Sequence, residues 1–265
     1  MCIRDRQGQH NIDTYRILCH QKYKELPTDA WLKPYAHMVT TKRLLTRIVL
    51  AIMNGKELVV KIQEFKPNVK REMDVYRIID SANHPNFAKL ICEFSCNDNI
   101  ITYDQTSTLR KGFCNGGEPI HLAVMPYYEL GSTESTKLDL VNFNSIVGQV
   151  MLASIEMWYI NGLVHNDLIP ANVLLIENAE PKSYFKNRLT VGYGKYQIII
   201  SDFGSSILSR DPSSQRFVVK DILVFIEQLS RVQRVDLPYN VYELFEMGFS
   251  DLIKFALKQK LITTV

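Results

Sequence analysis

The sequence predicts an α+β fold, with a small antiparallel β-sheet and one helix followed by a mainly helical region. Two β-rich runs at 47–52 and 57–62 flank a turn signal, and apolar residues recur at helical spacing over 69–81 and 142–160. At 265 residues the chain is long enough for one large domain or two small lobes.

The hairpin is predicted from its turn. Asn54-Gly55 suits a type I′ turn, because both central residues of that turn need positive φ. Lys61 lies in the second β-rich run among apolar residues. Taken alone, this position is as consistent with an edge-strand lysine whose amine reaches water as with a functional amine.

The elements that follow are predicted from apolar periodicity and from helix breakers. The helix over 69–81 ends at the polar segment 83–86. Its Glu72, taken alone, is typical of a solvated helix charge. Further strands are predicted over residues 87–94, 100–103 and 120–125.

The second half of the chain alternates helices with short apolar strands. The helix over 142–160 ends near Gly162, which suits a left-handed C-cap. Residues 177–194 are predicted to form an inserted hairpin or loop on the surface. The remaining expected elements are a buried strand over 196–201, an apolar helix over 217–232, and one or two helices within 233–265.

A polar loop between the long helix and the later buried strand has a chemically specific spacing. It contains His165, Asp167 and Asn172, and the strand leads directly into Asp202-Phe203-Gly204. In the pattern H-x-D-L-x-x-x-N, the aspartate can reach a hydroxyl that is being phosphorylated while the asparagine holds a magnesium ion. A lone Asp-Phe-Gly is common as a turn, but after this loop and strand the turn alternative is weak.

With Lys61 and Glu72 preceding them in order, these motifs resemble those of the eukaryotic-type protein kinase superfamily over residues 38–232. The resemblance implies a two-lobed, protein-kinase-like α+β fold, with a small antiparallel N-lobe that contains one helix and a mainly helical C-lobe. The implied divisions are an N-terminal extension at 1–37, an N-lobe at 38–127 and a C-lobe at 128–265.

The resemblance also implies a nucleotide site. Lys61 would contact the phosphates of ATP, with Glu72 as its ion-pair partner and Asp74 as the alternative partner. The adenine would lie between Val49, Val59 and Leu174, with Met125 as the gatekeeper and Tyr127 in the hinge.

Catalysis and metal binding are implied at the polar loop. Asp167 would be the catalytic base, and Asn172 and Asp202 would be the ligands of Mg²⁺. His165 and Phe203 are expected to hold this region together by packing. Asp221 is expected to bond to the loop backbone. The simpler alternative is that Asp221 only complements the helix dipole.

Four departures from the family pattern affect what the chain is expected to do. Residues 38–47 contain no glycine, so backbone amides would approach the phosphates poorly. Asn166 replaces the usual arginine, which makes regulation by loop phosphorylation doubtful. Ile169 replaces a lysine that lies near the transferred phosphoryl group. The segment after Gly204 is short and lacks Ala-Pro-Glu, so the sequence supports phosphoryl transfer more firmly than it supports a protein as the acceptor.

The predicted function is therefore an ATP-dependent phosphotransferase, a divergent serine/threonine protein kinase that uses ATP and Mg²⁺. Serine or threonine is favoured over tyrosine as the acceptor. One alternative is a small-molecule kinase of the aminoglycoside or choline type, which the short segment and the missing glycines favour. Another is a pseudokinase that acts as a binding module.

Charge, hydropathy and cysteine content indicate which partners and which cellular compartment to expect. A formal net charge of +3 is too small to indicate nucleic-acid or membrane binding. We identify no apolar run long enough to span a bilayer and no secretory signal. The five cysteines are scattered without zinc-site spacing, which is typical of reduced thiols in a cytoplasmic or otherwise intracellular protein.

Overall fold

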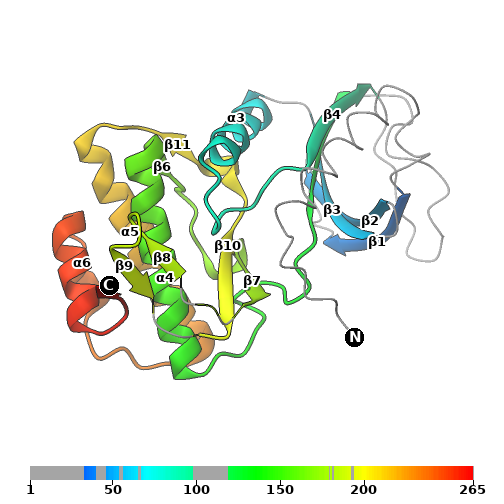
Figure 1. Ribbon diagram of the computed structural model, residues 1–265. Coiled ribbons are helices and arrows are strands. Elements are labelled where there is room, and N and C mark those ends of the chain that lie inside the picture. The colour runs from blue at the N-terminus through cyan, green and yellow to red at the C-terminus, as the bar shows by residue number, and fades with distance from the viewer. Residues whose placement is uncertain are drawn as a thin grey trace. The chain divides into compact units, whose positions relative to one another are not determined.

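The structure is a computed structural model, shown in Figure 1. It describes residues 33–39, 46–53, 56–64, 67–97, 119–178, 180, 182–191 and 194–264. The described residues form an α+β fold with antiparallel sheets and four α-helices. They divide into two compact units. The first unit consists of residues up to 73 and 89–127, and the second consists of residues 74–88 and 128 onwards.

The first unit is built on a five-stranded antiparallel sheet in the order β1-β2-β3-β5-β4. Its strands are β1 (Lys33–Val39), β2 (Thr46–Met53), β3 (Lys56–Glu64), β4 (Cys92–Asn97) and β5 (Pro119–Pro126). The predicted pairing of β2 with β3 is confirmed, and β3 is central because β5 pairs with its other edge. The turn residues Asn54-Gly55 lie outside the described residues.

Several details of the first unit differ from the prediction. The sheet begins at Lys33, within the segment predicted as an N-terminal extension. The strand predicted over 87–94 starts only at Cys92; Phe87, at the start of the predicted strand, belongs to the second unit and makes a single bridge to Ile200 there. The expected strand over 100–103 lies outside the described residues. Cys92 is disulfide-bonded, so the expectation of reduced thiols is wrong for this residue.

Helix α3 (Pro67–Ala82) confirms the predicted helix and contributes residues to both units. Val69 and Met73 are buried in its first half, and Tyr76 and Ile79 in its second. These positions recur every three or four residues, so one face of the helix carries the packing.

Helix α4 (Leu140–Asn161) is the core helix of the second unit, and Figure 1 shows β8 and β9 lying against it. The Asp139 side chain caps its start by accepting a hydrogen bond from the Asn142 amide at 2.7 Å. The predicted C-cap is confirmed, since Gly162 has φ 72°. By length and composition alone α4 could cross a membrane, which was not predicted, but 67% of its apolar window is buried inside the protein.

Two short antiparallel pairs hold the polar loop at its ends. Strand β6 (Leu163–Val164) pairs with β11 (Ile207–Leu208), and β7 (Val173–Glu177) pairs with β10 (Tyr196–Ile200). The loop therefore leaves and re-enters regular structure at fixed points.

Two more helices complete the second unit, and both predictions for this region are confirmed. They are α5 (Gln215–Gln233), which packs on α4, and α6 (Phe249–Lys258). Four short 3₁₀ turns lie among these elements, namely η1 (Pro170–Asn172), η2 (Phe203–Ser205), η3 (Pro212–Ser214) and η4 (Val241–Leu244).

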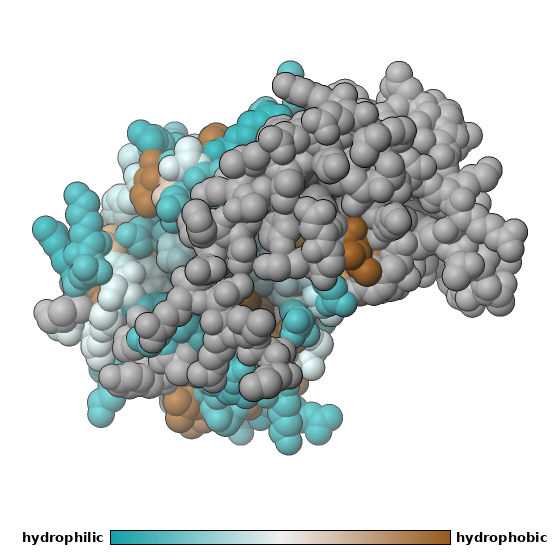
Figure 2. All heavy atoms as spheres, turned by 45° about the vertical axis from the view of Figure 1, so that its right-hand side comes forward, coloured by the Kyte–Doolittle hydropathy of each residue, from teal (hydrophilic) through white to brown (hydrophobic). Residues whose placement is uncertain are grey.

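The predicted inserted hairpin is present as β8 (Lys182–Tyr184) and β9 (Leu189–Val191), and β12 (Thr263–Thr264) adds a third strand. It is not simply a surface feature. Tyr184 is buried, and its hydroxyl donates a hydrogen bond to the Asn86 side chain at 2.9 Å. On the face shown in Figure 2, hydrophilic residues dominate the described surface, and apolar residues form small separate groups.

Candidate active site

Within the first unit, Lys61 and Glu72 form a buried ion pair with an Nζ–Oε1 distance of 2.7 Å. Lys61 is 7% exposed and Glu72 is 1% exposed. Because β3 is central, Lys61 is not an edge-strand lysine, and Glu72 is not a solvated charge. The alternative partner Asp74 is exposed and pairs with Arg77 instead.

Gln63 completes this buried cluster and was not predicted from the sequence. Its Nε2 donates a hydrogen bond to the second carboxylate oxygen of Glu72 at 3.1 Å. Gln63 lies two residues after Lys61, so both side chains project from the same face of β3. The carboxylate of Glu72 is thus held by an ammonium on one oxygen and an amide on the other.

The strand register decides which predicted adenine contacts share a face with Lys61. Val59 lies two residues before Lys61 and pairs with Met125, so both lie on the Lys61 face. Val49 pairs with Val60 and therefore lies on the opposite face of the sheet from Val59 and Lys61, so the two valines predicted beside adenine do not share a face. The β2 residues directly opposite Lys61 and Val59 on this face are Ile48 and Leu50.

Tyr127 follows the end of β5 in the first unit and is partly exposed. Leu174 is partly buried on β7 in the second unit, where it pairs with Ile199. The proposed roles of these two residues at a nucleotide remain predictions.

Within the second unit, the polar loop brings Asp167 and Asn172 together. Asn172 Nδ2 donates to the backbone carbonyl of Asp167 at 2.9 Å and lies 3.4 Å from its Oδ2. This contact turns the amide nitrogen of Asn172 toward the loop, so its oxygen points away from Asp167. The turn η1 produces the reversal that allows the contact.

Asp202 lies next to Asn172 because β7 and β10 pair in register up to Val173 and Ile200. The Ser201 amide donates to the Asn172 carbonyl at 2.9 Å, and the Ser201 hydroxyl donates to the same oxygen at 3.0 Å. Asp202 has φ 62° and ψ 75°, in the left-handed region. Such backbone conformations are costly for residues other than glycine and cluster at functional sites.

His165 and Phe203 join the loop to the Asp-Phe-Gly turn, as predicted. His165 Nε2 donates to the Ser201 carbonyl at 2.9 Å, and its ring centroid lies 5.4 Å from that of Phe203. Phe203 also packs edge-on against Tyr76 at 5.0 Å. Burial lowers the pKa of His165, and the nearby carboxylates of Asp202 and Asp167 oppose this effect only in part.

Asp221 on α5 holds the loop from the other side, and the prediction that it bonds to the loop backbone is confirmed. The Asn166 amide donates to its Oδ2 at 2.7 Å. Burial raises the pKa of Asp221 to about 6, while the amides of Asn166 and His165 and the Lys220 ammonium lower it. The negative charge of Asp167 also raises this pKa.

The segment after Gly204 is anchored by contacts that the sequence did not reveal. The buried Ser206 hydroxyl donates to the His165 carbonyl at 3.1 Å, and Asn166 Nδ2 lies 3.4 Å from the Ser205 carbonyl. Asn166 has φ 63°, a conformation that asparagine tolerates better than most residues. Isolated serines and asparagines are common, so no spacing in the sequence marks these positions.

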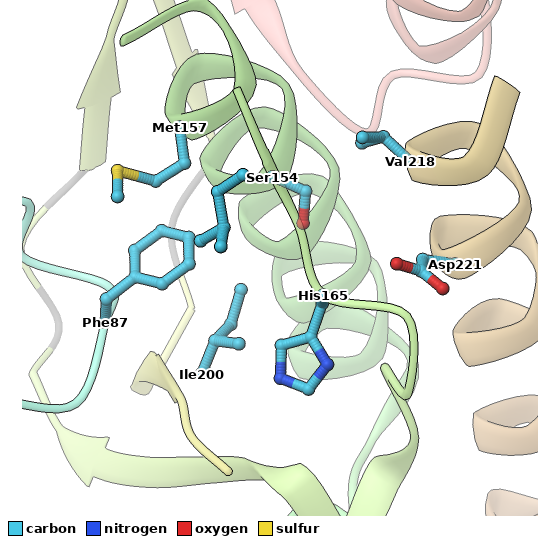
Figure 3. Close-up of a pocket in the computed structure, with 8 residues that line it drawn as sticks. Phe87, Ser154, Met157, His165, Ile200, Val218 and Asp221 are labelled. Carbon is cyan, nitrogen blue, oxygen red and sulfur yellow. The ribbon is translucent and has the colours of Figure 1, made fainter. Parts of the chain in front are cut away.

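Within the part of the chain that the structure describes, two hollows are lined by residues of the loop. One has a volume of only about 10 Å³, and Figure 3 shows His165 and Asp221 among the residues around it. That volume suits about one water molecule, so it is a packing feature. The other has a volume of about 200 Å³ and lies beside Asp167, between the loop and α5.

Among the described residues, no group of three or more His, Cys, Asp or Glu side chains could hold a metal ion. The oxygen donors of Asn172 and Asp202 suit a hard cation that keeps water or phosphate ligands, as Mg²⁺ does. They therefore fit a magnesium ion brought with a phosphate-bearing substrate, and do not form a metal cage of their own.

No model of a known protein family matches this sequence, and no curated protein sequence matches it either. Its chemistry must therefore be inferred from the geometry of these residues.

Proposed function

We propose that the chain is an ATP-dependent phosphotransferase with a two-lobed, protein-kinase-like fold, which transfers the γ-phosphoryl group of ATP to a serine or threonine hydroxyl. The observation that carries this proposal is the cluster of Asp167, Asn172 and Asp202 at adjoining ends of β7 and β10. Phosphoryl transfer requires positioning and charge neutralisation more than covalent chemistry, and this cluster can supply both.

Each residue of the cluster has a role suited to its position. The exposed carboxylate of Asp167 would accept the proton of the acceptor hydroxyl. Asn172 and Asp202 would hold Mg²⁺, which when bound neutralises charge on the phosphates. The left-handed backbone of Asp202 fixes where its carboxylate projects after the strand.

The buried ion pair of the first unit supports the same function. Burying a lysine and a glutamate removes both from water, and such a pair rarely improves stability over apolar residues of the same size. Its presence on a central strand is explained if the Lys61 ammonium, oriented by Glu72, binds the phosphates of ATP.

The anchored segment after Gly204 supports activity without loop phosphorylation. Ser206 and Asn166 hold this segment directly on the loop backbone, and β11 pairs with β6. These contacts hold the segment in place without a phosphate group bound to an arginine.

A small hydroxylated metabolite is the second candidate acceptor. Residues 206–214 contain only β11 and η3 before α5 begins, so this segment forms no extended shelf for a peptide. Parallel screens of hydroxylated metabolites and generic protein substrates would separate the two classes.

The test is ATP-dependent transfer of labelled phosphate by the purified full chain. Asp167→Asn should lower the turnover about 100-fold to 10,000-fold, the usual contribution of a general base. Asp202→Asn should abolish Mg²⁺-dependent turnover, and Asp236→Asn, a change at an exposed loop carboxylate, should leave it unchanged. Equal labelling by wild type and Asp167→Asn would overturn the assignment.

A further inference from the structure

The 200 Å³ pocket beside Asp167 has one wall from the loop and one from α5. The loop contributes Asp167 and Ile169. The α5 side chains that line it recur at helical spacing, so a single face of the helix forms the wall; they are Phe217, Lys220, Val224 and Gln228. A ligand in this pocket would lie directly against the predicted base.

Lys220 is the one cationic side chain among the described residues that line this pocket. The carboxylates of Asp167 and Asp221 also line it. The three charges therefore lie around the same space. Lysine has a flexible four-carbon stem, so its ammonium can follow a group that enters the pocket.

Negative charge spreads over three equatorial oxygens when a phosphoryl group is transferred, and a cation placed there lowers the barrier. Ile169 lines the pocket next to the base but carries no charge. On this side of the base, α5 is the element that brings a cationic side chain to the pocket.

We propose that Lys220 is a catalytic residue that places a positive charge against the transferred phosphoryl group in the pocket beside Asp167. This inference rests on the proposed phosphotransferase function. In the step, a bond forms between the acceptor oxygen and the γ-phosphorus while the bond from that phosphorus to the bridging oxygen breaks. ADP leaves with the electron pair of that bond, and the hydroxyl proton passes to the Asp167 carboxylate.

The experiment compares three substitutions in the full chain by steady-state kinetics. Lys220→Met should lower kcat about 100-fold, which is the usual loss of one charge-stabilising group, and leave the KM for ATP unchanged. Lys220→Arg should retain more activity than Lys220→Met. Lys258→Met, a change at an exposed lysine of α6, is the matched control and should match wild type.

A rescue separates a charge effect from a packing effect. Adding Ile169→Lys to Lys220→Met puts an ammonium back into the same pocket from the other wall, so it should recover at least about tenfold of the lost kcat. A purely structural role for Lys220 would not respond to that second change. Thermal melts should show that all variants remain folded, since Lys220 is exposed.

The outcomes distinguish this inference from the function on which it rests. If wild type transfers no phosphate from ATP, both fail. If wild type is active and Asp167→Asn is not, but Lys220→Met keeps the wild-type kcat, then the role of Lys220 alone is wrong. That role is equally wrong if Ile169→Lys gives no recovery of kcat.

Discussion

The buried pair of Lys61 and Glu72 allows stability and function to be separated in one set of variants. Lys61→Met removes the ammonium that binds Oε1 of Glu72. The Glu72 carboxylate is only 1% exposed, and its described partner is then the Gln63 amide on Oε2. Breaking a buried ion pair by removing one partner costs about 3–5 kcal/mol. We expect the free energy of unfolding to fall by that amount.

Replacing both partners has a different expected result. In Lys61→Met/Glu72→Leu, no buried charge is left unpaired, and apolar replacements of such pairs are often neutral or stabilising by about 1–4 kcal/mol. The double variant should therefore be at least as stable as wild type. The coupling energy from the cycle should be at least about 3 kcal/mol.

The assay is urea unfolding of wild type, Lys61→Met, Glu72→Leu and the double variant, with amide hydrogen exchange on β3 and β5 to localise the change to the first unit. Lys70→Met, at an exposed lysine of α3, is the control and should change stability by less than about 0.5 kcal/mol. If the stability losses of the two single variants simply add in the double variant, the pair is not coupled and the structural reasoning fails. A stable double variant that no longer transfers phosphate would show that the pair is kept for function.

Four further changes test the second unit. Asp221, whose pKa is raised from 3.8 to about 6, destabilises the folded state above pH 6, and this effect fades on acidification and is absent below 3.8. The unfolding free energy of wild type relative to Asp221→Asn should therefore fall by about 3 kcal/mol from pH 3.8 to pH 7 in urea titrations. Phe203→Ala should cost about 3–5 kcal/mol in the same unfolding assay, because the ring is fully buried against other aromatic rings. Asn166→Ala should lower stability by about 1 kcal/mol and Asn166→Gly by much less, because φ there is 63°; equal losses would contradict that backbone assignment. Gly162→Ala should lower the melting temperature by several degrees, because its Cβ would lie 2.7 Å from the Ser209 backbone at a φ of 72°.

Much of the secondary structure was predictable because local rules suffice for it. The β2–β3 hairpin followed from β-branched runs around a turn signal, and α4 from periodicity and a glycine stop. The strand predicted over 87–94 was partly wrong because Phe87 packs on the aromatic core of the second unit. Local propensity contains no information about such a partner.

The candidate site also had residues that the sequence predicted and residues whose positions only the structure revealed. Motif spacing indicated Asp167 and Asn172, since chain spacing decides which groups one loop can present, and the Asp-Phe-Gly triplet after an apolar strand indicated Asp202. Register decided that Val49 faces away from Lys61, because a one-residue difference in pairing moves a side chain to the other face of a sheet.

The amino-acid sequence by itself determined which chemical groups are present and in what order. Only the tertiary structure decided that Glu72 and not Asp74 pairs with Lys61, and that Ser206 and Lys220 lie against the polar loop. These contacts join residues that are far apart in the chain. They depend on how helices and strands pack, and packing is a property of the whole fold that no local pattern contains.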